Sequence, residues 1–174
     1  MREVERDRFV PESPTVVARA LSPERIVEWE GSFSVVDVAE PDAANSDTGA
    51  ATTGTSNVER AETSDTGTRT AETPTDRDGN ATLVTVSGPG VGFRLRFERT
   101  PDGYHYLVPD GDDPAGPFDH MESWLSVDPE NEGSRVRIRS VVSLNAPLPF
   151  ADRIAAWKRG GELDRTLDGL ADAV

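Results

Sequence analysis

Apolar and polar residues alternate along several short stretches of the chain, as they do in strands with one buried face. The clearest stretch runs from Val91 to Arg99, where Phe93, Leu95 and Phe97 alternate with charged side chains. Similar but weaker patterns, bounded by residues typical of turns, predict six more strands. These cover Glu3 to Val10, Val27 to Val38, Leu83 to Ser87, Tyr104 to Val108, Phe118 to Val127 and Ser134 to Leu144.

Two short helices and one long helix are predicted from cap signals and helical spacing. Ser13-Pro14 and Ser22-Pro23 each place a capping serine before a proline at the first helical position, so we expect helices over 13–21 and from Ser22 through Ile26. Near the C-terminus, apolar residues at mainly helical spacings predict a long helix, which Gly160-Gly161 should interrupt and bend or loosen. Those apolar residues are Phe150, Ile154, Trp157, Leu163, Leu167, Leu170 and Val174.

The stretch from Glu40 to Gly79 breaks these patterns. Its only large apolar residue is Val58, and it contains nine acidic residues and three arginines. It cannot bury enough surface to offset the entropy of ordering, so we expect residues 40–79 to be a disordered acidic insert between the second and third strands. The chain then forms a single α+β domain over 1–174. Seven antiparallel strands must curl over the last helix to bury its apolar stripe.

The segment Pro14 to Trp29, PTVVARALSPERIVEW, together with this order of elements, resembles the START-like (SRPBCC, Bet v 1-like) superfamily. The resemblance covers the chain apart from 40–79 and is greatest to small SRPBCC proteins of haloarchaea. It implies a helix-grip fold, in which a curved seven-stranded antiparallel sheet wraps around the C-terminal helix. It also implies a cavity between sheet and helix, which relatives use to bind lipids, isoprenoids, quinones, polyketides or other apolar molecules; some relatives cyclise or dehydrate polyketides.

The charge of the chain indicates the salt conditions and the partners to which the protein is suited. Acidic residues outnumber basic ones 32 to 18, giving a net charge of −14, and 17 of the basic residues are arginine. The acidity suits either an ordinary soluble protein or one adapted to concentrated salt. The near absence of lysine favours salt adaptation, because the long lysine stem exposes hydrocarbon that salt drives toward aggregation. So acidic a chain is poorly suited to nucleic acid, which needs a basic face.

Several kinds of chemistry and location are excluded by what the sequence lacks. It has no cysteine, which removes disulfides, thiolate metal sites and cysteine nucleophiles. It shows no apolar signal segment and no run of membrane-spanning length, so we expect a cytoplasmic protein without integral membrane association. No cofactor or metal is expected, and the oligomeric state stays open.

Alternation predicts which side chains face the expected cavity. The inward set from the strands is Phe93, Leu95, Phe97, Met121, Ser123, Leu125, Val127, Val136, Ile138, Ser140 and Val142, and Trp29, Phe33, Tyr106 and Trp157 are expected to join it. All of these except Val127, Val136 and Val142 are our candidate ligand contacts. Apolar walls with a few hydroxyl groups are typical of ligand pockets, although the same side chains could simply fill the core.

The remaining candidate residues are expected on the outer face. His120 and Glu122 share a face and could transfer a proton or hold a metal, but Met121 and Leu125 take the inward side, which argues against either role. Arg135, Arg137 and Arg139 should lie opposite Glu122, Trp124 and Ser126. Cross-strand ion pairs and an arginine over Trp124 would explain this row; a docking patch for an acidic partner is the alternative.

Three functions stay open from the sequence. The first is a non-enzymatic module that binds a small apolar ligand, and the second is an enzyme like the polyketide cyclases or dehydrases. The third is a ligand-free interaction or maturation factor. An apolar cavity favours the first, convergence of Tyr106, Ser123 or His105 on one point favours the second, and a filled core leaves the third.

Overall fold

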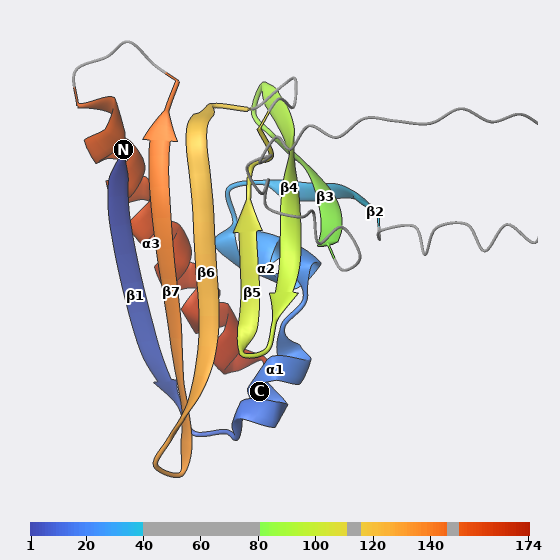
Figure 1. Ribbon diagram of the computed structural model, residues 1–174, viewed down its shortest axis with the longest axis vertical. Coiled ribbons are helices and arrows are strands. Elements are labelled where there is room, and N and C mark those ends of the chain that lie inside the picture. Colours follow the sequence, from blue (N-terminus) through green and yellow to red (C-terminus); the bar gives the residue numbers. More distant parts are fainter. Residues whose placement is uncertain (40–80, 111–115, 146–149) are drawn as a thin grey trace, which may run out of the picture.

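The structure, a computed structural model, describes residues 1–39, 81–110, 116–145 and 150–174, so the expected insert at 40–79 lies outside the described residues. One sheet and three helices make up the described part (Figure 1). The strands are β1 (Arg2–Val10), β2 (Ser34–Ala39), β3 (Ala81–Gly88), β4 (Val91–Thr100), β5 (Gly103–Leu107), β6 (Phe118–Glu130) and β7 (Gly133–Leu144). The helices are α1 (Pro14–Ala20), α2 (Pro23–Glu30) and α3 (Ala151–Asp172).

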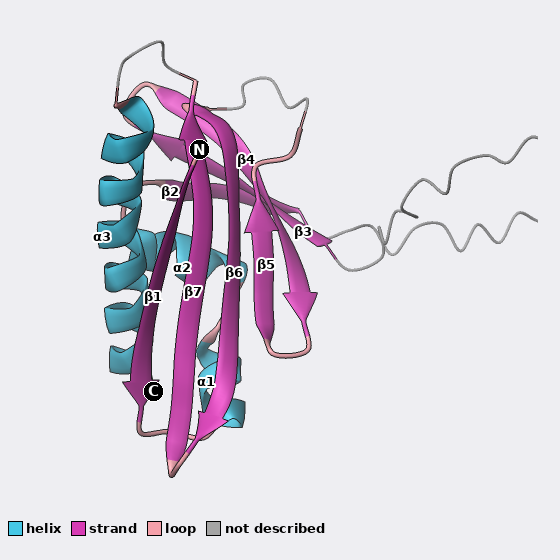
Figure 2. Cartoon of the chain, turned by 60° about the vertical axis from the view of Figure 1, so that its left-hand side comes forward, coloured by secondary structure: helices cyan, strands magenta, loops and turns pink. Residues whose placement is uncertain are grey.

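The seven strands form one curved antiparallel sheet in the order β1-β7-β6-β5-β4-β3-β2. Helix α3 runs along one side of this sheet and packs against β1, β7 and α2 (Figure 2). The element order and the curled sheet around a C-terminal helix confirm the fold expected from the sequence. None of the described helices is long and apolar enough to cross a bilayer.

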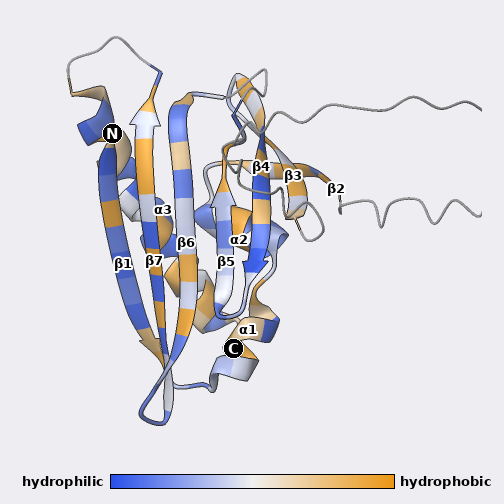
Figure 3. Ribbon diagram, viewed as in Figure 1, coloured by the Kyte–Doolittle hydropathy of each residue, from blue (hydrophilic) through white to orange (hydrophobic). Residues whose placement is uncertain are grey.

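The core lies between the sheet and the helices. Strands β6 and β7 are banded with alternating polar and apolar residues (Figure 3). Their inward residues are buried, as are Phe93, Leu95 and Phe97 on β4, which confirms the predicted alternation. Phe97 stacks on Tyr106 with ring centroids 4.7 Å apart.

Helix α2 is longer than the sequence predicted. Its cap is as expected, because the Ser22 hydroxyl accepts a hydrogen bond from the Arg25 backbone N–H. The helix continues to Glu30 and ends at Gly31, whose φ of 70° is the left-handed geometry that closes helices. The expected strand over 27–38 is therefore wrong in its first half: Trp29 lies on α2, and β2 begins only at Ser34.

Helix α3 is unbroken across Gly160-Gly161, contrary to the predicted interruption. Packing explains part of this result, since Gly160 is buried and a Cβ there would lie 2.7 Å from Nη2 of Arg6 on β1. This atom is the far end of a flexible side chain that can move aside, so Gly160 faces β1 but space alone does not require a glycine there. Helix propensity is a weak preference that such tertiary contacts override.

The arginine row on β7 is paired with carboxylates of the edge strand β1. Glu3 bonds Arg139 at 2.7 Å, Glu5 lies 3.4 Å from Arg137, and Asp7 bonds Arg135 at 2.9 Å. Two of the three residues expected opposite the row are found there on β6: Trp124 is opposite Arg139 and Ser126 is opposite Arg137. The third, Glu122, pairs with Val141 beyond the row, and the residue opposite Arg135 is Asp128.

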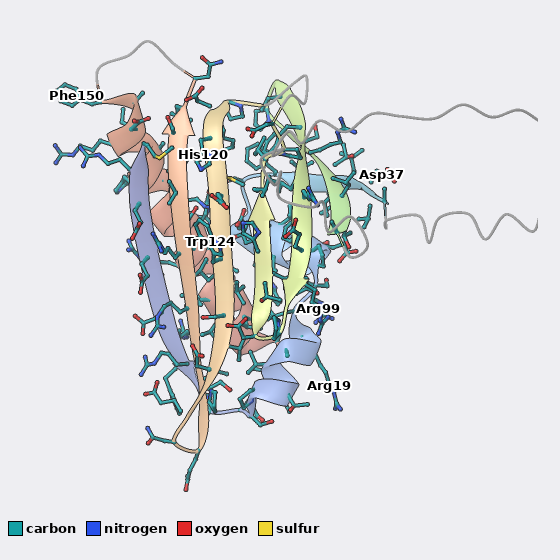
Figure 4. All side chains as sticks on the ribbon, in the orientation of Figure 1. Arg19, Asp37, Arg99, His120, Trp124 and Phe150 are labelled. Carbon is teal, nitrogen blue, oxygen red and sulfur yellow. The ribbon has the colours of Figure 1, made fainter. Side chains whose placement is uncertain are left out.

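The guanidinium of Arg139 lies over the Trp124 ring, 5.4 Å from its centroid, which confirms the expected arginine above this tryptophan. Figure 4 shows Trp124 on β6, on the face of the sheet opposite α3. The row is therefore explained by contacts within the sheet.

Candidate functional site

A cluster of buried charges and hydroxyl groups lies between the sheet and α3, and Arg159 is its centre. Arg159 points from α3 toward the sheet and is only 2% exposed. Its Nη2 lies 2.8 Å from Glu30 Oε1 and donates to the Tyr106 hydroxyl at 2.9 Å, while its Nη1 donates to Glu162 Oε2 at 3.0 Å. One guanidinium therefore joins α2, α3 and β5.

Two serines complete the cluster on the sheet side. Arg159 Nε donates to Ser140 Oγ at 3.0 Å, and Nη2 also reaches Ser123 Oγ at 3.1 Å. The two hydroxyl groups are hydrogen-bonded to each other at 2.8 Å, since Ser123 and Ser140 are paired across β6 and β7. The guanidinium is thus surrounded by hydrogen-bond acceptors on its inward side.

The end of α2 is shaped by the same cluster. The Glu30 carboxylate accepts from the Tyr106 hydroxyl at 2.8 Å, and the Glu30 backbone carbonyl accepts two bonds from Arg165 on α3. The Ser32 hydroxyl, just beyond Gly31, donates to Glu162. The bonds from Arg165 satisfy the Glu30 carbonyl, one of the groups that a helix end leaves free, and with the bond from Ser32 they dock the end of α2 onto α3.

Burial disfavours the charged forms of Arg159 and Glu162, but the ion pairs of Arg159 with Glu162 and Glu30 favour the charged forms more strongly. Burial lowers the pKa of Arg159, but Glu30 and the other acidic neighbours raise it well above its ordinary value. Burial raises the pKa of the Glu162 carboxyl, but Arg159 and Ser32 bring it below its ordinary value. Burial, with the Glu30 carboxylate beside it, raises the pKa of Tyr106 well above that of a free phenol. The phenol is therefore neutral while Arg159 and Glu162 are charged.

An apolar pocket of about 230 Å³ lies beside this cluster, between α3 and the start of β6 and the end of β7. Arg159 and Glu162 are polar residues of its wall, and Lys158, which pairs with Glu162 at 3.1 Å, lies at its exposed side. Its remaining wall is apolar and consists of Pro117, Phe118, Val142, Leu144, Ile154 and Ala155. The pocket thus combines an apolar wall with a few charged groups, which is the usual make-up of a ligand site.

Most of the residues expected to face the cavity are in the core between sheet and helices. Buried or half-buried are Trp29, Phe33, Phe93, Leu95, Phe97, Tyr106, Met121, Ser123, Leu125, Ile138 and Ser140. None of these lines the 230 Å³ pocket, and only Val142 of the wider inward set does. The expected inward position of Trp157 is wrong, because this side chain is 81% exposed on the outer side of α3.

The sequence reasoning missed Arg159, Glu30 and Glu162. A signal for Arg159 existed, since it stands four residues before Leu163, on the stripe that continues through Leu167 and Leu170. Trp157 stands six residues before Leu163, which at about 100° per residue is about 120° away from that stripe. Glu30 was missed because the segment that contains it was predicted to be a strand.

Both histidines lie away from the pocket, on the outer face of the sheet. His105 Nε2 is 2.8 Å from Glu122 Oε1, and the His105 ring stacks on Trp124 with centroids 5.4 Å apart. His120 is 3.6 Å from the other oxygen of Glu122, and Figure 4 shows it on β6. Among the described residues, no three histidine, aspartate or glutamate side chains lie close enough together to hold a metal ion.

Comparison with known proteins supports the architecture. No family model matches the chain, and no curated protein matches it. Solved structures do match along nearly the whole chain. A START superfamily protein from Mycobacterium smegmatis is 13% identical, with 98% of this chain and 94% of that chain covered and a TM-score of 0.58.

Two other structures have the same architecture. Ara h 8.0201 is 8% identical over 98% of this chain and 95% of its own, with a TM-score of 0.52. The di-domain ARO/CYC BexL from the BE-7585A biosynthetic pathway is 14% identical over 99% of this chain and 46% of its own, with a TM-score of 0.57. At these identities the likeness concerns the fold. The chain therefore has the START-like (SRPBCC, Bet v 1-like) helix-grip fold.

Proposed function

We propose that this protein binds a small, neutral, mostly apolar molecule in the pocket between α3 and the β6–β7 end of the sheet. The observation that carries the proposal is the 230 Å³ space with an apolar wall formed by side chains such as Phe118, Leu144 and Ala155. The resemblance to START-like proteins implies a cavity for apolar ligands between the sheet and the C-terminal helix, and the shared fold supports the same use here.

The pocket volume limits the size of the ligand. An apolar cavity of about 150 Å³ is large enough for benzene, so a space of 230 Å³ suits a molecule of about one or two rings or a short branched chain. A long lipid or a large polyketide would fit only with part of its length. Small aromatic and isoprenoid-sized compounds are therefore the best candidates within the apolar class.

The charged residues of the pocket favour a ligand without a charge of its own. Arg159 is already bonded to two carboxylates and three hydroxyl groups, and Glu162 accepts from Arg159, Ser32 and Lys158. An anionic ligand would have to compete with Glu30 and Glu162 for the same guanidinium. A neutral ligand leaves these bonds intact and gains by burying its apolar surface.

An enzymatic role is the second candidate, because Tyr106 and Ser123 do converge on Arg159. The di-domain ARO/CYC protein, with the same fold, gives that candidate a precedent. The geometry favours binding, since neither Tyr106 nor Ser123 lines the pocket and both are fully buried. The raised pKa of Tyr106 also makes this phenol a poor proton donor to a substrate near neutral pH.

The test is to reduce the volume of the pocket by a substitution on α3 that leaves the helix itself intact. Ala155→Met directs a longer apolar side chain into the pocket, whereas Ala156→Met adds the same side chain at a half-buried position of α3 that does not line it. Binding of Prodan, a neutral dye with a two-ring naphthalene core that matches the size of the pocket, is followed by fluorescence for both variants and the unmodified protein. We expect Ala155→Met to weaken binding by about tenfold or more and Ala156→Met to leave it near the original value.

Native mass spectrometry of the purified protein provides the complementary measurement. A bound apolar molecule that is present in the original protein and absent in Ala155→Met supports the proposal. Dye affinities that are equal in the two methionine variants, with melting temperatures close to the original, would overturn it. Thermal melting of each variant separates loss of binding from loss of folding.

A further inference from the structure

Large apolar side chains gather on the exposed side of the N-terminal half of α3. Trp157 is 81% exposed, Phe150 74% and Ile154 62%, and they succeed one another at spacings of one helical turn. Met1 is 66% exposed and borders the same hollow as Phe150 at the start of α3. Figure 4 shows Phe150 projecting away from the body of the molecule at this end. We call Met1, Phe150, Ile154 and Trp157 the α3 patch.

The α3 patch is more than the scattered exposure that every protein shows. Four of the eight exposed large hydrophobic residues in the described part of the chain are gathered here. Contiguous patches of this kind mark surfaces that contact a partner or a membrane. Residues 40–80 could offer little apolar surface to cover it, because Val58 is their only large apolar side chain.

The charges around the α3 patch differ in sign from those of the whole chain. Arg2, Arg153 and Lys158 are exposed beside it. The acidic residues here are each paired: Asp152 with the N-terminal amine, Asp164 with Arg6, and Glu162 with Arg159 and Lys158. The chain as a whole has a net charge of −14. A locally basic, apolar surface on so acidic a protein is complementary to a partner that is both apolar and anionic.

We propose that the α3 patch docks on the surface of an anionic lipid bilayer. Tryptophan prefers the boundary between headgroups and acyl chains, and arginine or lysine beside it contacts anionic headgroups. Ile154 and Lys158 belong both to the patch region and to the wall of the 230 Å³ pocket. Docking would therefore bring the pocket against a reservoir of apolar molecules. This last step deepens the proposed function and rests on it, whereas the docking itself does not.

The experiment is co-sedimentation of the full chain with vesicles. Vesicles of phosphatidylcholine containing phosphatidylglycerol are compared with vesicles of phosphatidylcholine alone, at the lowest salt in which the protein stays folded. We expect binding to the anionic vesicles and much weaker binding to the neutral ones. The double variant Phe150→Ser/Trp157→Ser should bind the anionic vesicles about tenfold more weakly or worse.

A matched control comes from the other end of the sheet. Val36 on β2 is 64% exposed and lies outside the patch, so Val36→Ser should bind vesicles like the original protein. Neither Phe150 nor Trp157 lines the 230 Å³ pocket, so Prodan binding of the double variant should be unchanged; docking and ligand binding can therefore fail separately. The proposal is overturned if the original protein ignores both vesicles, or if the double variant binds them equally well. It is also overturned if the patch instead holds two copies of the chain together in solution, seen as a dimer that the double variant abolishes.

Discussion

Arg159 is the residue on which the interior of this protein depends most. It is buried between two acidic side chains, Glu30 and Glu162, and it contacts hydroxyl groups from three strands, β5, β6 and β7. No buried side-chain nitrogen or oxygen in the described residues lacks a hydrogen-bond partner. A fully satisfied buried ion pair contributes little net stability compared with apolar packing, but removing one partner leaves an uncompensated charge.

Arg159→Met should therefore lower the free energy of unfolding by about 3–5 kcal/mol. Arg153→Met, an exposed change on the same helix, should alter it by less than about 0.5 kcal/mol. Urea unfolding at constant potassium chloride measures both. Adding Glu30→Gln and Glu162→Gln to Arg159→Met should restore part of the loss, because no buried carboxylate then lacks its cation. A stable Arg159→Met single variant would contradict this account of the cluster.

Acid should weaken the same cluster through Glu162. The pKa of this carboxyl lies below its ordinary value when folded, so it stabilises the protein above the unfolded pKa of about 4.3, and that stability is lost as the pH falls through the folded value. Glu162→Gln removes this contribution. The stability difference between the original protein and Glu162→Gln should thus be largest near neutral pH and narrow below about pH 4. Urea unfolding at a series of pH values measures it.

An exposed glutamate provides the control for this pH series. Glu132 lies in the turn between β6 and β7, so Glu132→Gln should follow the pH dependence of the original protein closely. A stability difference for Glu162→Gln that stays constant from neutral to acid pH would show that Glu162 does not titrate as inferred.

Among the elements, α3 shows how tertiary packing selects the facing side of a helix. Its buried stripe runs through Ala155, Arg159, Leu163, Thr166 and Leu170. The large apolar residues of its first half lie on the opposite side and are exposed. If hydrophobicity alone set the orientation of α3, Ile154 and Trp157 would face the sheet. The hydrogen bonds available to Arg159 explain the observed orientation.

Two glycines of α3 should respond in opposite directions to the same substitution. A Cβ at Gly161 would meet only Arg165 Nη1 at 3.6 Å, so Gly161→Ala should stabilise the protein by about 0.5–1 kcal/mol through helix propensity. A Cβ at Gly169 would lie 2.4 Å from Cδ1 of Trp29, so Gly169→Ala should destabilise it by about 1–3 kcal/mol. Urea unfolding measures the free energy of unfolding of both variants and of the original protein. Changes of equal sign would mean that α2 and α3 are not packed as closely as described.

For the whole molecule, the net charge of −14 is the dominant property. The pairs between β1 and β7 are half exposed, and such pairs contribute at most about 1 kcal/mol each, so they do not offset the general repulsion. Salt screens that repulsion and strengthens apolar burial. Adaptation to concentrated salt stays a prediction from composition.

The melting temperature should accordingly rise as potassium chloride increases from dilute buffer to molar concentration, and refolding should be more complete in salt. Circular dichroism during heating and cooling measures both. Changing exposed acidic residues such as Glu132 to glutamine in groups should reduce this dependence. Full stability and complete refolding in dilute buffer would contradict salt adaptation.

The sequence by itself determined the order of the elements and the alternation of the strands, whereas the helix-grip fold was implied by the resemblance to START-like proteins. These features follow from local periodicity and cap residues, which act over a few neighbouring positions. It could not place Glu30, whose segment has strand-like alternation but folds as the last turn of α2. Helical spacing puts Arg159 on the buried stripe of α3, but no local pattern indicates which groups would pair with its charge.

Only the tertiary structure decided that the charged side chain of Arg159 is buried on this stripe, and where the pocket lies. A guanidinium is buried without a large cost only when hydrogen-bonding partners surround it, and here they come from α2, α3 and three strands. These partners are far apart in the sequence, so no local sequence pattern indicates that they lie together. The same long-range packing filled the middle of the expected cavity with side chains and left the 230 Å³ pocket at one end.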